Sequence, residues 1–336
     1  MGFLMTILGG AGEGVLWGIM AFGVYITYRL LDVADLTVEG SFATGSAIVA
    51  LLINNNCDPL LASLVALLVG GVAGMVTGLL ITKFKIAPIL AGILTMTALY
   101  SVNLIIMGMP TLSLPIGVNM FAIVSAWFND AVARNLIILI IGLIVSAIII
   151  GASYWFFGTE VGSAIRATGS NEKMCRAQGI NTDNTKIIGL MISNALVAFS
   201  GSLVAQQFGY GDISFGVGSI VIGLASVIIG EAIISAKHNF LLRIISVFVG
   251  SIIYREIITL IIFAGLPTDY IKLLTAVLVV IALSLPNIKG KFKRSSKSNN
   301  SKRVKEAVGN PTDVIMNDEV ANQIVENTEK EGSENA

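Results

Sequence analysis

The sequence is poor in the residues that catalytic and disulfide-stabilised proteins depend on. It has one histidine and two cysteines among 336 residues, and only 12% of its residues are charged. No His-Glu-x-x-His or Gly-x-Ser-x-Gly motif occurs, and the single histidine, His238, stands at the end of an apolar run. The only Gly-Lys pair is followed by Phe292, so the chain lacks a phosphate-binding loop. We therefore expect no catalytic residue, no metal site, no nucleic-acid partner and no ATP bound by this chain.

What the sequence has instead is hydrophobic residues, which make up 55% of it. Apolar runs of about 17 to 25 residues recur as far as Pro286, and this is the length that crosses the hydrocarbon core of a bilayer as a helix. The predicted spans are residues 13–31, 36–54, 60–82, 88–107, 136–157, 187–207, 215–234, 241–264 and 270–286. Unbroken rather than alternating runs select helices over a barrel. The predicted fold class is all-α, a polytopic integral membrane protein with nine spans, within a range of eight to ten.

Charged residues predict the orientation. Eight Lys or Arg and no acid lie between Lys289 and Lys305, and an acidic, Asn-rich stretch follows. Basic loops prefer the cytoplasm, so nine crossings place the C-terminus inside and the N-terminus outside. Residues 1–286 then form the transmembrane domain, and residues 287–336 form a disordered cytoplasmic tail. Cys57 and Cys175 fall on opposite faces of the membrane, so no disulfide is expected.

Two short polar motifs indicate an inverted repeat. Asp35-Leu-Thr-Val-Glu-Gly-Ser41 begins the second predicted span, and Asp212-Ile-Ser-Phe-Gly-Val-Gly-Ser219 begins the seventh. Because five spans separate them, the second copy enters the membrane from the opposite side. Motifs this short also arise by chance. If the repeat is real, spans 1 to 4 correspond to spans 6 to 9.

The first motif, within the stretch DVADLTVEGSF, has two interpretations. In one, Asp32 is solvated at the cytoplasmic end while Asp35 and Thr37 cap the helix and Glu39 lies in its first turn. In the other, the helix is broken inside the membrane and borders a polar route. The residues that we predict along such a translocation pathway are Asp35, Thr37, Glu39, Ser41, Met96, Tyr100, Asn103, Asp212 and Ser214. A Met and aromatic stripe such as that of span 4 is also typical of a helix core.

Two other intramembrane features predict packing or pairing. Gly70, Gly74 and Gly78 form a GxxxGxxxG ladder, which lets a second helix approach closely in lipid. Arg255 and Glu256 lie near the middle of span 8, where ionisable groups normally face a cavity or a partner. Since adjacent residues of a helix point in different directions, these two are not expected to pair with each other. Around residues 114–129, a further apolar segment with Trp127 is expected to lie in the outer interface.

The most specific signal is the long polar loop at residues 158–186, in which Asn171 to Ala177 predicts a short capped helix. Residues 165 to 180, IRATGSNEKMCRAQGI, resemble the R-A-x-G-x-N-x-x-A-A-x-x-x-G-I loop of the ABC importer permeases for branched-chain amino acids, ribose and purine nucleosides. Asp35-Leu-Thr-Val-Glu-Gly-Ser41 is similar to their D-L-S-V-G-S, and more so to the D-L-T-V-(D/E)-G-S of tryptophan and tyrosine importer permeases. Glu39 departs from the sugar permeases, which have Gly there.

This resemblance implies a permease subunit of an ATP-driven importer in the bacterial cytoplasmic membrane. It implies a second permease copy as a homodimer partner, ATPase subunits that hold ATP and Mg²⁺, and an extracellular substrate-binding lipoprotein. The substrate expected is a small polar or aromatic solute such as an amino acid. The ATPase-coupling residues that it implies are Arg166, Ala167, Gly169, Asn171, Glu172, Arg176 and Gly179. The alternative is an ion-coupled secondary transporter, in which Asp35, Glu39, Arg255 and Glu256 would form a relay.

Overall fold

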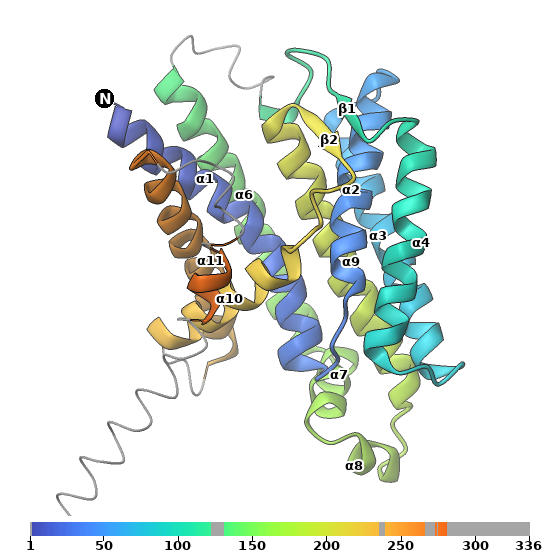
Figure 1. The fold of residues 1–336 in the computed structure, drawn as a ribbon. Coiled ribbons are helices and arrows are strands. Elements are labelled where there is room, and N and C mark those ends of the chain that lie inside the picture. Colours follow the sequence, from blue (N-terminus) through green and yellow to red (C-terminus); the bar gives the residue numbers. More distant parts are fainter. Residues whose placement is uncertain (1, 122–130, 235–238, 266–272, 274, 281–336) are drawn as a thin grey trace, which may run out of the picture. The chain divides into compact units, whose positions relative to one another are not determined.

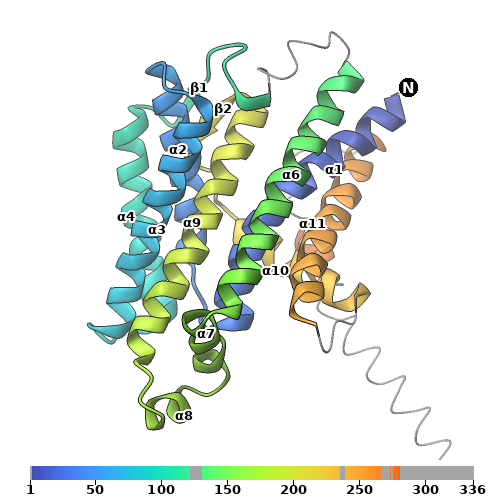
Figure 2. The same ribbon diagram turned by 180° about the vertical axis from the view of Figure 1, so that it is seen from behind.

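The computed structural model describes residues 2–121, 131–234, 239–265, 273 and 275–280. Helices dominate this part of the chain (Figures 1 and 2). In chain order they are α1 (Gly2–Tyr25), the π-helical turn η1 (Ile26–Leu30), α2 (Thr37–Asn54), α3 (Pro59–Thr82), α4 (Pro88–Met107), α6 (Ala131–Gly158), α7 (Glu160–Ser170), α8 (Glu172–Ala177), α9 (Thr182–Phe208), α10 (Ser219–Ile233) and α11 (Phe240–Phe263). The predicted tail and the segment around Trp127 lie outside the described residues.

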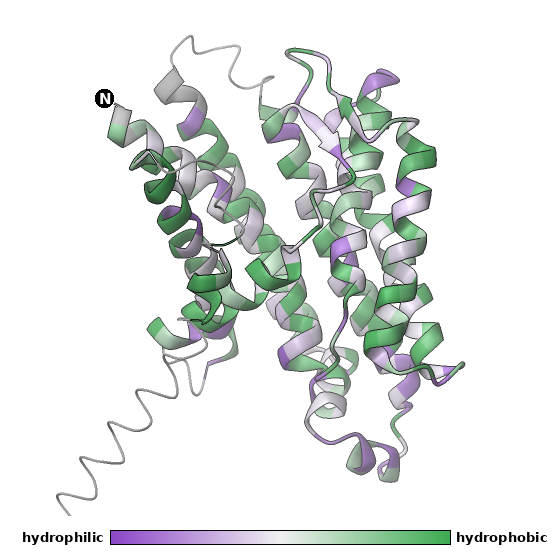
Figure 3. Cartoon of the chain, in the orientation of Figure 1, coloured by the Kyte–Doolittle hydropathy of each residue, from purple (hydrophilic) through white to green (hydrophobic). Residues whose placement is uncertain are grey.

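Seven helices within the described residues are long and apolar enough to cross a membrane, and each coincides with a predicted span. They are Met5–Leu30, Thr37–Asn54, Pro59–Thr82, Pro88–Met107, Asn135–Gly158, Thr182–Phe208 and Phe240–Phe263. Figure 3 shows apolar residues over most of their length, with polar residues gathered on α8. The polytopic helical fold class is therefore confirmed.

The seventh predicted span is wrong at its beginning. Residues 213–218 form turns, and α10 starts only at Ser219 and has 15 residues. At 1.5 Å per residue it is about 22 Å long, shorter than the hydrocarbon core. Glycines at 216 and 218 account for the late start, because Gly218 adopts the left-handed conformation (φ 84°) that ends or precedes helices. Most of the ninth predicted span lies outside the described residues.

The glycine ladder of α3 lies against α9. A Cβ added at Gly70 would come within 2.3 Å of the Ala198 side chain, and one at Gly74 within 2.2 Å of the Leu190 carbonyl oxygen. At Gly78 the nearest atom would be the backbone of Ile187, at 2.9 Å. Such spacing requires glycine because the two backbones themselves are in contact.

A second pair of helices packs in the same manner. On α1, a Cβ at Gly14 would meet the backbone of Ile252 on α11 at 2.6 Å, and one at Gly18 would meet the Phe248 ring at 2.7 Å. If α1 corresponds to α9 and α3 to α11, the repeat maps the α3–α9 contact onto the α1–α11 contact. The close glycine packing at both contacts agrees with the inverted repeat that the two motifs indicate.

A two-stranded ribbon joins the ends of α4 and α9. Strands β1 (Thr111–Ser113) and β2 (Tyr210–Asp212) pair antiparallel, with Thr111 opposite Asp212 and Ser113 opposite Tyr210. No strand was predicted from the sequence, since three residues are too few to show an alternating pattern. The ribbon brings the second polar motif next to α2, where the side chain of Ser46 donates a hydrogen bond to the Asp212 carbonyl oxygen (3.1 Å).

Candidate functional site

The first polar motif begins α2 inside the helical bundle. Asp35 is only 2% exposed, and its carboxylate accepts hydrogen bonds from the backbone N–H of Thr37 (2.9 Å) and the side-chain amide of Asn194 (2.7 Å). The oxygen of that amide accepts a hydrogen bond from the Ser41 hydroxyl (2.7 Å). Asn194 lies twelve residues beyond the start of α9. The start of α2 is therefore held near the middle of α9 rather than at one of its ends.

On the other side of the start of α2, hydroxyl groups connect it to α3 and α4. Thr37 contacts Thr77 of α3 at 2.7 Å, and Thr77 contacts Thr95 of α4 at 3.0 Å, all three side chains being buried. A Cβ on Gly92 would lie 2.7 Å from the backbone nitrogen of Leu36. The chain before α2 therefore runs between helices α3, α4 and α9, as Figure 1 shows, and Asp32 is the exposed acid of the stretch. Asp35 thus bonds to the first backbone N–H of α2, whereas the N-cap itself is Leu36, and the Thr37 hydroxyl bonds to Thr77 instead of capping the helix as predicted.

The two polar motifs meet at Glu39. Its carboxylate accepts a hydrogen bond from the backbone N–H of Gly218 (3.0 Å), the residue before α10. A Cβ on Gly216 would lie 1.8 Å from the Glu39 carbonyl oxygen, so the segment 213–218 crosses α2 at backbone contact. Glu39 of the first motif therefore satisfies the backbone N–H of Gly218, the N-cap residue of α10 at the end of the second motif.

The second motif repeats the local geometry of the first. Asp212 accepts a hydrogen bond from the backbone N–H of Ser214 (2.6 Å), as Asp35 does from Thr37 two residues on. Asp212 also accepts hydrogen bonds from the hydroxyls of Ser214 (2.5 Å) and Thr111 (2.7 Å). Burial acts to raise the pKa of Asp212, but these hydrogen bonds together hold it below its usual value. Asp212 and Ser214 lie at the ribbon, apart from the start of α2.

A cavity of about 160 Å³ lies where α2, α4 and the segment 213–217 come together. Four of the residues predicted along a pathway line it, namely Glu39, Met96, Tyr100 and Asn103, and the remaining wall is Gly40, Ala43, Thr97, Ile213, Gly216 and Val217. Asp35, Thr37 and Ser41 do not line it, because their side chains bond to α3 and α9.

Asn103 is the unusual member of this cavity. Its side chain is fully buried, yet neither its amide nitrogen nor its amide oxygen has a hydrogen-bond partner among the described residues. A buried amide without partners costs about 1 to 3 kcal/mol for each unsatisfied group. Tyr100 beside it is 54% exposed and Glu39 is half-buried. The wall of the cavity therefore holds a buried amide, an aromatic ring and a carboxylate.

The polar loop folds into two short helices at the lower end of Figure 1. The predicted short helix is α8, and Asn171 is its N-cap, its side chain accepting a hydrogen bond from the backbone N–H of Met174 (3.0 Å). Gly179 follows α8 in the left-handed conformation (φ 82°). Helix α7 was not predicted, although Thr159 caps it in the ordinary way. Its Gly169 packs on η1, where a Cβ would lie 1.9 Å from the Leu30 carbonyl oxygen.

An ion-pair network anchors α8 to the start of α9. Arg176 donates hydrogen bonds to Glu172 (2.9 Å), Asp183 (3.0 Å) and the Thr182 hydroxyl (2.7 Å). Glu172 also accepts a hydrogen bond from Lys186 (2.8 Å). These contacts hold α8 in a fixed orientation while leaving much of the Arg176 side chain exposed, at 59%.

The structure separates the two arginines predicted for ATPase coupling. Arg176 belongs to α8, whereas Arg166 belongs to α7 and lies over the ring of Phe240, 5.0 Å from its centroid. The part of the loop that the structure presents outward is thus α8, with Asn171, Glu172 and Arg176.

Comparison with known proteins decides the family. A family model described as "Branched-chain amino acid transport system / permease component" matches residues 6–283. The chain belongs to this permease family. It is accordingly the permease component of an ABC importer and a multi-pass protein of the bacterial cytoplasmic membrane, rather than an ion-coupled transporter.

Individual relatives agree with this assignment of the permease. It is 36% identical over 284 residues to the tyrosine transport system permease protein of Clostridioides difficile (strain R20291), covering 84% of this chain and 92% of the relative. It is 30% identical over 270 residues to the uncharacterized protein RP368 of Rickettsia prowazekii, covering 79% and 92%. To the ribose import permease protein RbsC of Escherichia coli K12 it is 28% identical over 184 residues, covering 54% and 56%. No solved structure matches the permease.

One ion pair of the permease was missed from the sequence. Arg255 pairs with Glu13 of α1 (3.1 Å), and its guanidinium lies 4.5 Å from the centroid of the Trp17 ring. Arg255 and Glu256 do not pair with each other, as expected from their adjacent positions. Glu13 carried no signal, because a lone acid in an apolar run shows neither its partner nor its burial.

Lowering the pH is expected to loosen α8 of the permease. The hydrogen bond from Lys186 is the largest cause that holds the pKa of Glu172 below its usual value, and the charge of Arg176 adds to it. Because this pKa is lower in the folded chain, the network stabilises α8 above the ordinary pKa of a glutamate and is lost as the pH falls through the lowered value. Since the Glu172 side chain is 37% exposed and solvent screens its charge, the expected effect is about twofold.

The measurement is hydrogen exchange of the amides from Met174 to Ile180, compared between the wild type and Glu172→Gln at each pH. At pH 7 the wild type should exchange about twofold more slowly, and the two should converge below the lowered pKa of Glu172. A ratio that stays constant across the whole pH range would contradict a role for the Glu172 charge.

Proposed function

We propose that the cavity bounded by α2, α4 and residues 213–217 is part of the translocation pathway of the importer. The observation that carries this proposal is Asn103, a buried amide that lines the cavity beside Tyr100 and Glu39 and has no hydrogen-bond partner in the described part of the chain. An aromatic amino acid would suit such a site, since its ring can lie on Tyr100 while its polar groups bond to the amide and the carboxylate. The tyrosine transport permease among the relatives supports this substrate class.

The rest of the mechanism that we propose uses partners. Two copies of the permease form the route, an extracellular binding protein delivers the solute, and ATPase subunits hold ATP and Mg²⁺ and dock on α8. Movement of α8 passes to α9 through the Arg176 contacts with Thr182 and Asp183. Asn194, farther along α9, holds Asp35 and Ser41 at the start of α2. A tilt of α9 would therefore shift Glu39 and change the cavity.

Cysteine accessibility tests the pathway. In a background of Cys57→Ser and Cys175→Ala, we expect Glu39→Cys and Tyr100→Cys to react with a water-soluble thiol reagent in membranes. With the ATPase, the binding protein and saturating tyrosine present, labelling should become severalfold slower. The matched control is Ile148→Cys on α6, which is 64% exposed and faces outward on an apolar stretch.

The control position should stay unlabelled, because lipid excludes the reagent. If neither Glu39→Cys nor Tyr100→Cys reacts in any state, or if both react no faster than Ile148→Cys, the cavity is not part of an aqueous route.

A further inference from the structure

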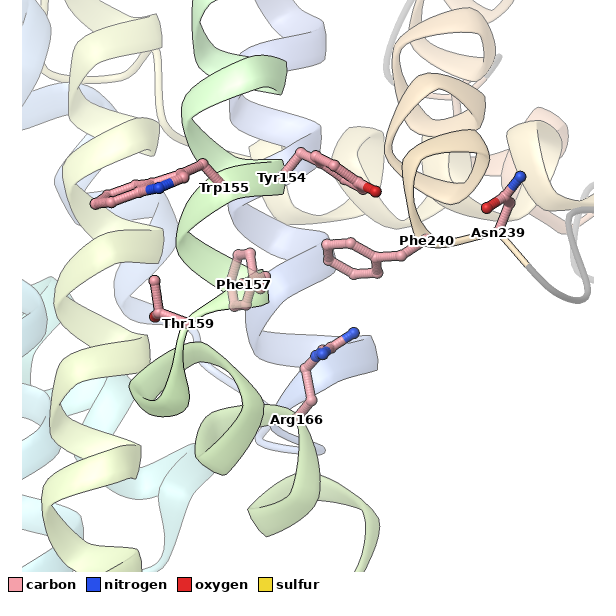
Figure 4. Close-up of a pocket in the computed structure, with 8 residues that line it drawn as sticks. Tyr154, Trp155, Phe157, Thr159, Arg166, Asn239 and Phe240 are labelled. Carbon is pink, nitrogen blue, oxygen red and sulfur yellow. The ribbon is translucent and has the colours of Figure 1, made fainter.

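Two adjoining cavities lie beside α7, away from the proposed pathway. One, of about 560 Å³, is lined by Tyr154, Trp155, Phe157, Gly158, Thr159, Arg166, Asn239 and Phe240 (Figure 4). The other, of about 420 Å³, is lined by Arg29, Leu30, Arg166, Gly169, Ser170, Phe240 and Arg243. Arg166 and Phe240 belong to both, so the two cavities form one recess between α6, α7, η1 and α11.

Positive charge gathers in this recess. Three guanidinium groups line it, those of Arg29, Arg166 and Arg243, and none of the lining residues is acidic. Glu231 pairs with Arg29. Arg166 makes no ion pair with a described residue, and its buried Nε has no hydrogen-bond partner among these residues either. Arg166 therefore brings to the recess a guanidinium that pairs with no carboxylate of the described residues, which suits an anion with several oxygens.

The surroundings of the recess are those of a membrane interface. Tyr154 and Phe240 project into the same space in Figure 4, with the Arg166 side chain beside them. Tyr154 is 53% exposed and Trp155 is 73% exposed, and both lie in the last two turns of α6. Aromatic residues with basic residues nearby mark the level of lipid headgroups.

Helix α6 also presents an apolar stripe. Ile140, Ile144 and Ile148, four residues apart on one face, are 46%, 55% and 64% exposed. Only 22% of the α6 span is buried inside the described chain. An acyl chain could lie along this stripe while its headgroup occupies the recess, so the charged and the apolar parts fit one amphiphilic molecule.

We propose that this recess binds the phosphate headgroup of an anionic glycerophospholipid, with Arg166 as the central contact and Arg29 and Arg243 on its rim. The lipid would bridge α7, which leads into α8, to the start of α11. This site is separate from the cavity at Asn103, and its test needs neither the ATPase nor a transported solute. The failure of one proposal therefore leaves the other standing.

Native mass spectrometry of the full chain in detergent tests the site. The probes are phosphatidylglycerol, phosphatidylcholine with the same acyl chains, and inorganic phosphate, which differ in mass and are told apart directly. We expect the wild type to retain phosphatidylglycerol in preference to phosphatidylcholine, and Arg166→Gln to weaken that retention by about tenfold.

The matched control is Lys83→Gln, which removes the same charge from an exposed position between α3 and α4 and should change retention by less than about twofold. A second variant, Ser170→Glu, adds a carboxylate at an exposed rim position without removing a contact, and should weaken phosphatidylglycerol as Arg166→Gln does. It covers the case in which loss of Arg166 impairs folding.

Three results would overturn the proposal. Equal retention of the two lipids, or a preference that survives both Arg166→Gln and Ser170→Glu, would exclude an anionic lipid in this recess. Retention of inorganic phosphate that displaces phosphatidylglycerol would identify a free-phosphate site instead.

Discussion

Gly74→Ala is expected to lower the melting temperature of the permease by roughly 2 to 6 °C and to reduce the yield of folded protein. The added methyl group would lie 2.2 Å from the Leu190 carbonyl oxygen and 2.7 Å from its carbon, which are backbone atoms that no rotamer change can move. Helix α3 would have to move away from α9, and in lipid no hydrophobic effect restores the lost contact. Overpacking of this kind costs about 1 to 3 kcal/mol.

The same displacement would disturb the functional site. The third atom that the new methyl group meets is the Cβ of Asn194, at 3.0 Å, and Asn194 holds both Asp35 and Ser41. Transport by any folded Gly74→Ala protein should therefore also fall.

Gly71→Ala is the matched control for this prediction. It makes the same chemical change on the same helix, but its methyl group would find its nearest neighbours at an ordinary 3.7 Å. Thermal unfolding in detergent, followed by fluorescence-detected size exclusion, measures both variants. Equal melting temperatures for Gly71→Ala and Gly74→Ala would show that α3 and α9 do not pack as closely as described.

Local signals account for what the sequence predicted well. Seven helices of the described chain could be predicted from apolar runs of membrane length, because length and hydropathy are properties of a single segment. Helix α8 was also predictable, since its N-cap, Asn171, stands directly before it. Met96, Tyr100 and Asn103 share one helical face, so the periodicity of α4 alone placed them on one wall of the cavity.

Partners from distant segments could not be predicted. Asp35 and Asn194 are 159 residues apart, and nothing in the run around Asn194 distinguishes it from a helix-packing residue. Likewise, loop position alone could not show that Arg166 lies over Phe240 while Arg176 bonds to Asp183. The late start of α10 depends on the close approach of Gly216 to Glu39, which is a tertiary contact.

Arg176→Glu should reduce coupled uptake by at least about tenfold in a permease that still folds. The substitution places a third carboxylate beside Glu172 and Asp183 and removes the hydrogen bond to Thr182, so repulsion replaces the contacts between α8 and α9. Helix α8 would then no longer be a rigid element, and closure of the ATPase subunits would move it without tilting α9. The measurement compares ATP hydrolysis and tyrosine uptake in proteoliposomes that contain the permease, the ATPase and the binding protein.

Lys173→Glu separates the rigidity of α8 from its surface charge. Lys173 is an exposed residue of the same helix and makes no ion pair with a described residue, so its reversal changes the charge by the same amount and leaves the network to α9 intact. If anchoring of α8 transmits the motion, Lys173→Glu should retain most uptake while Arg176→Glu does not. Equal losses in the two variants would instead assign the effect to charge on the docking surface. Normal uptake and stimulated ATP hydrolysis in Arg176→Glu would exclude α8 as the coupling contact.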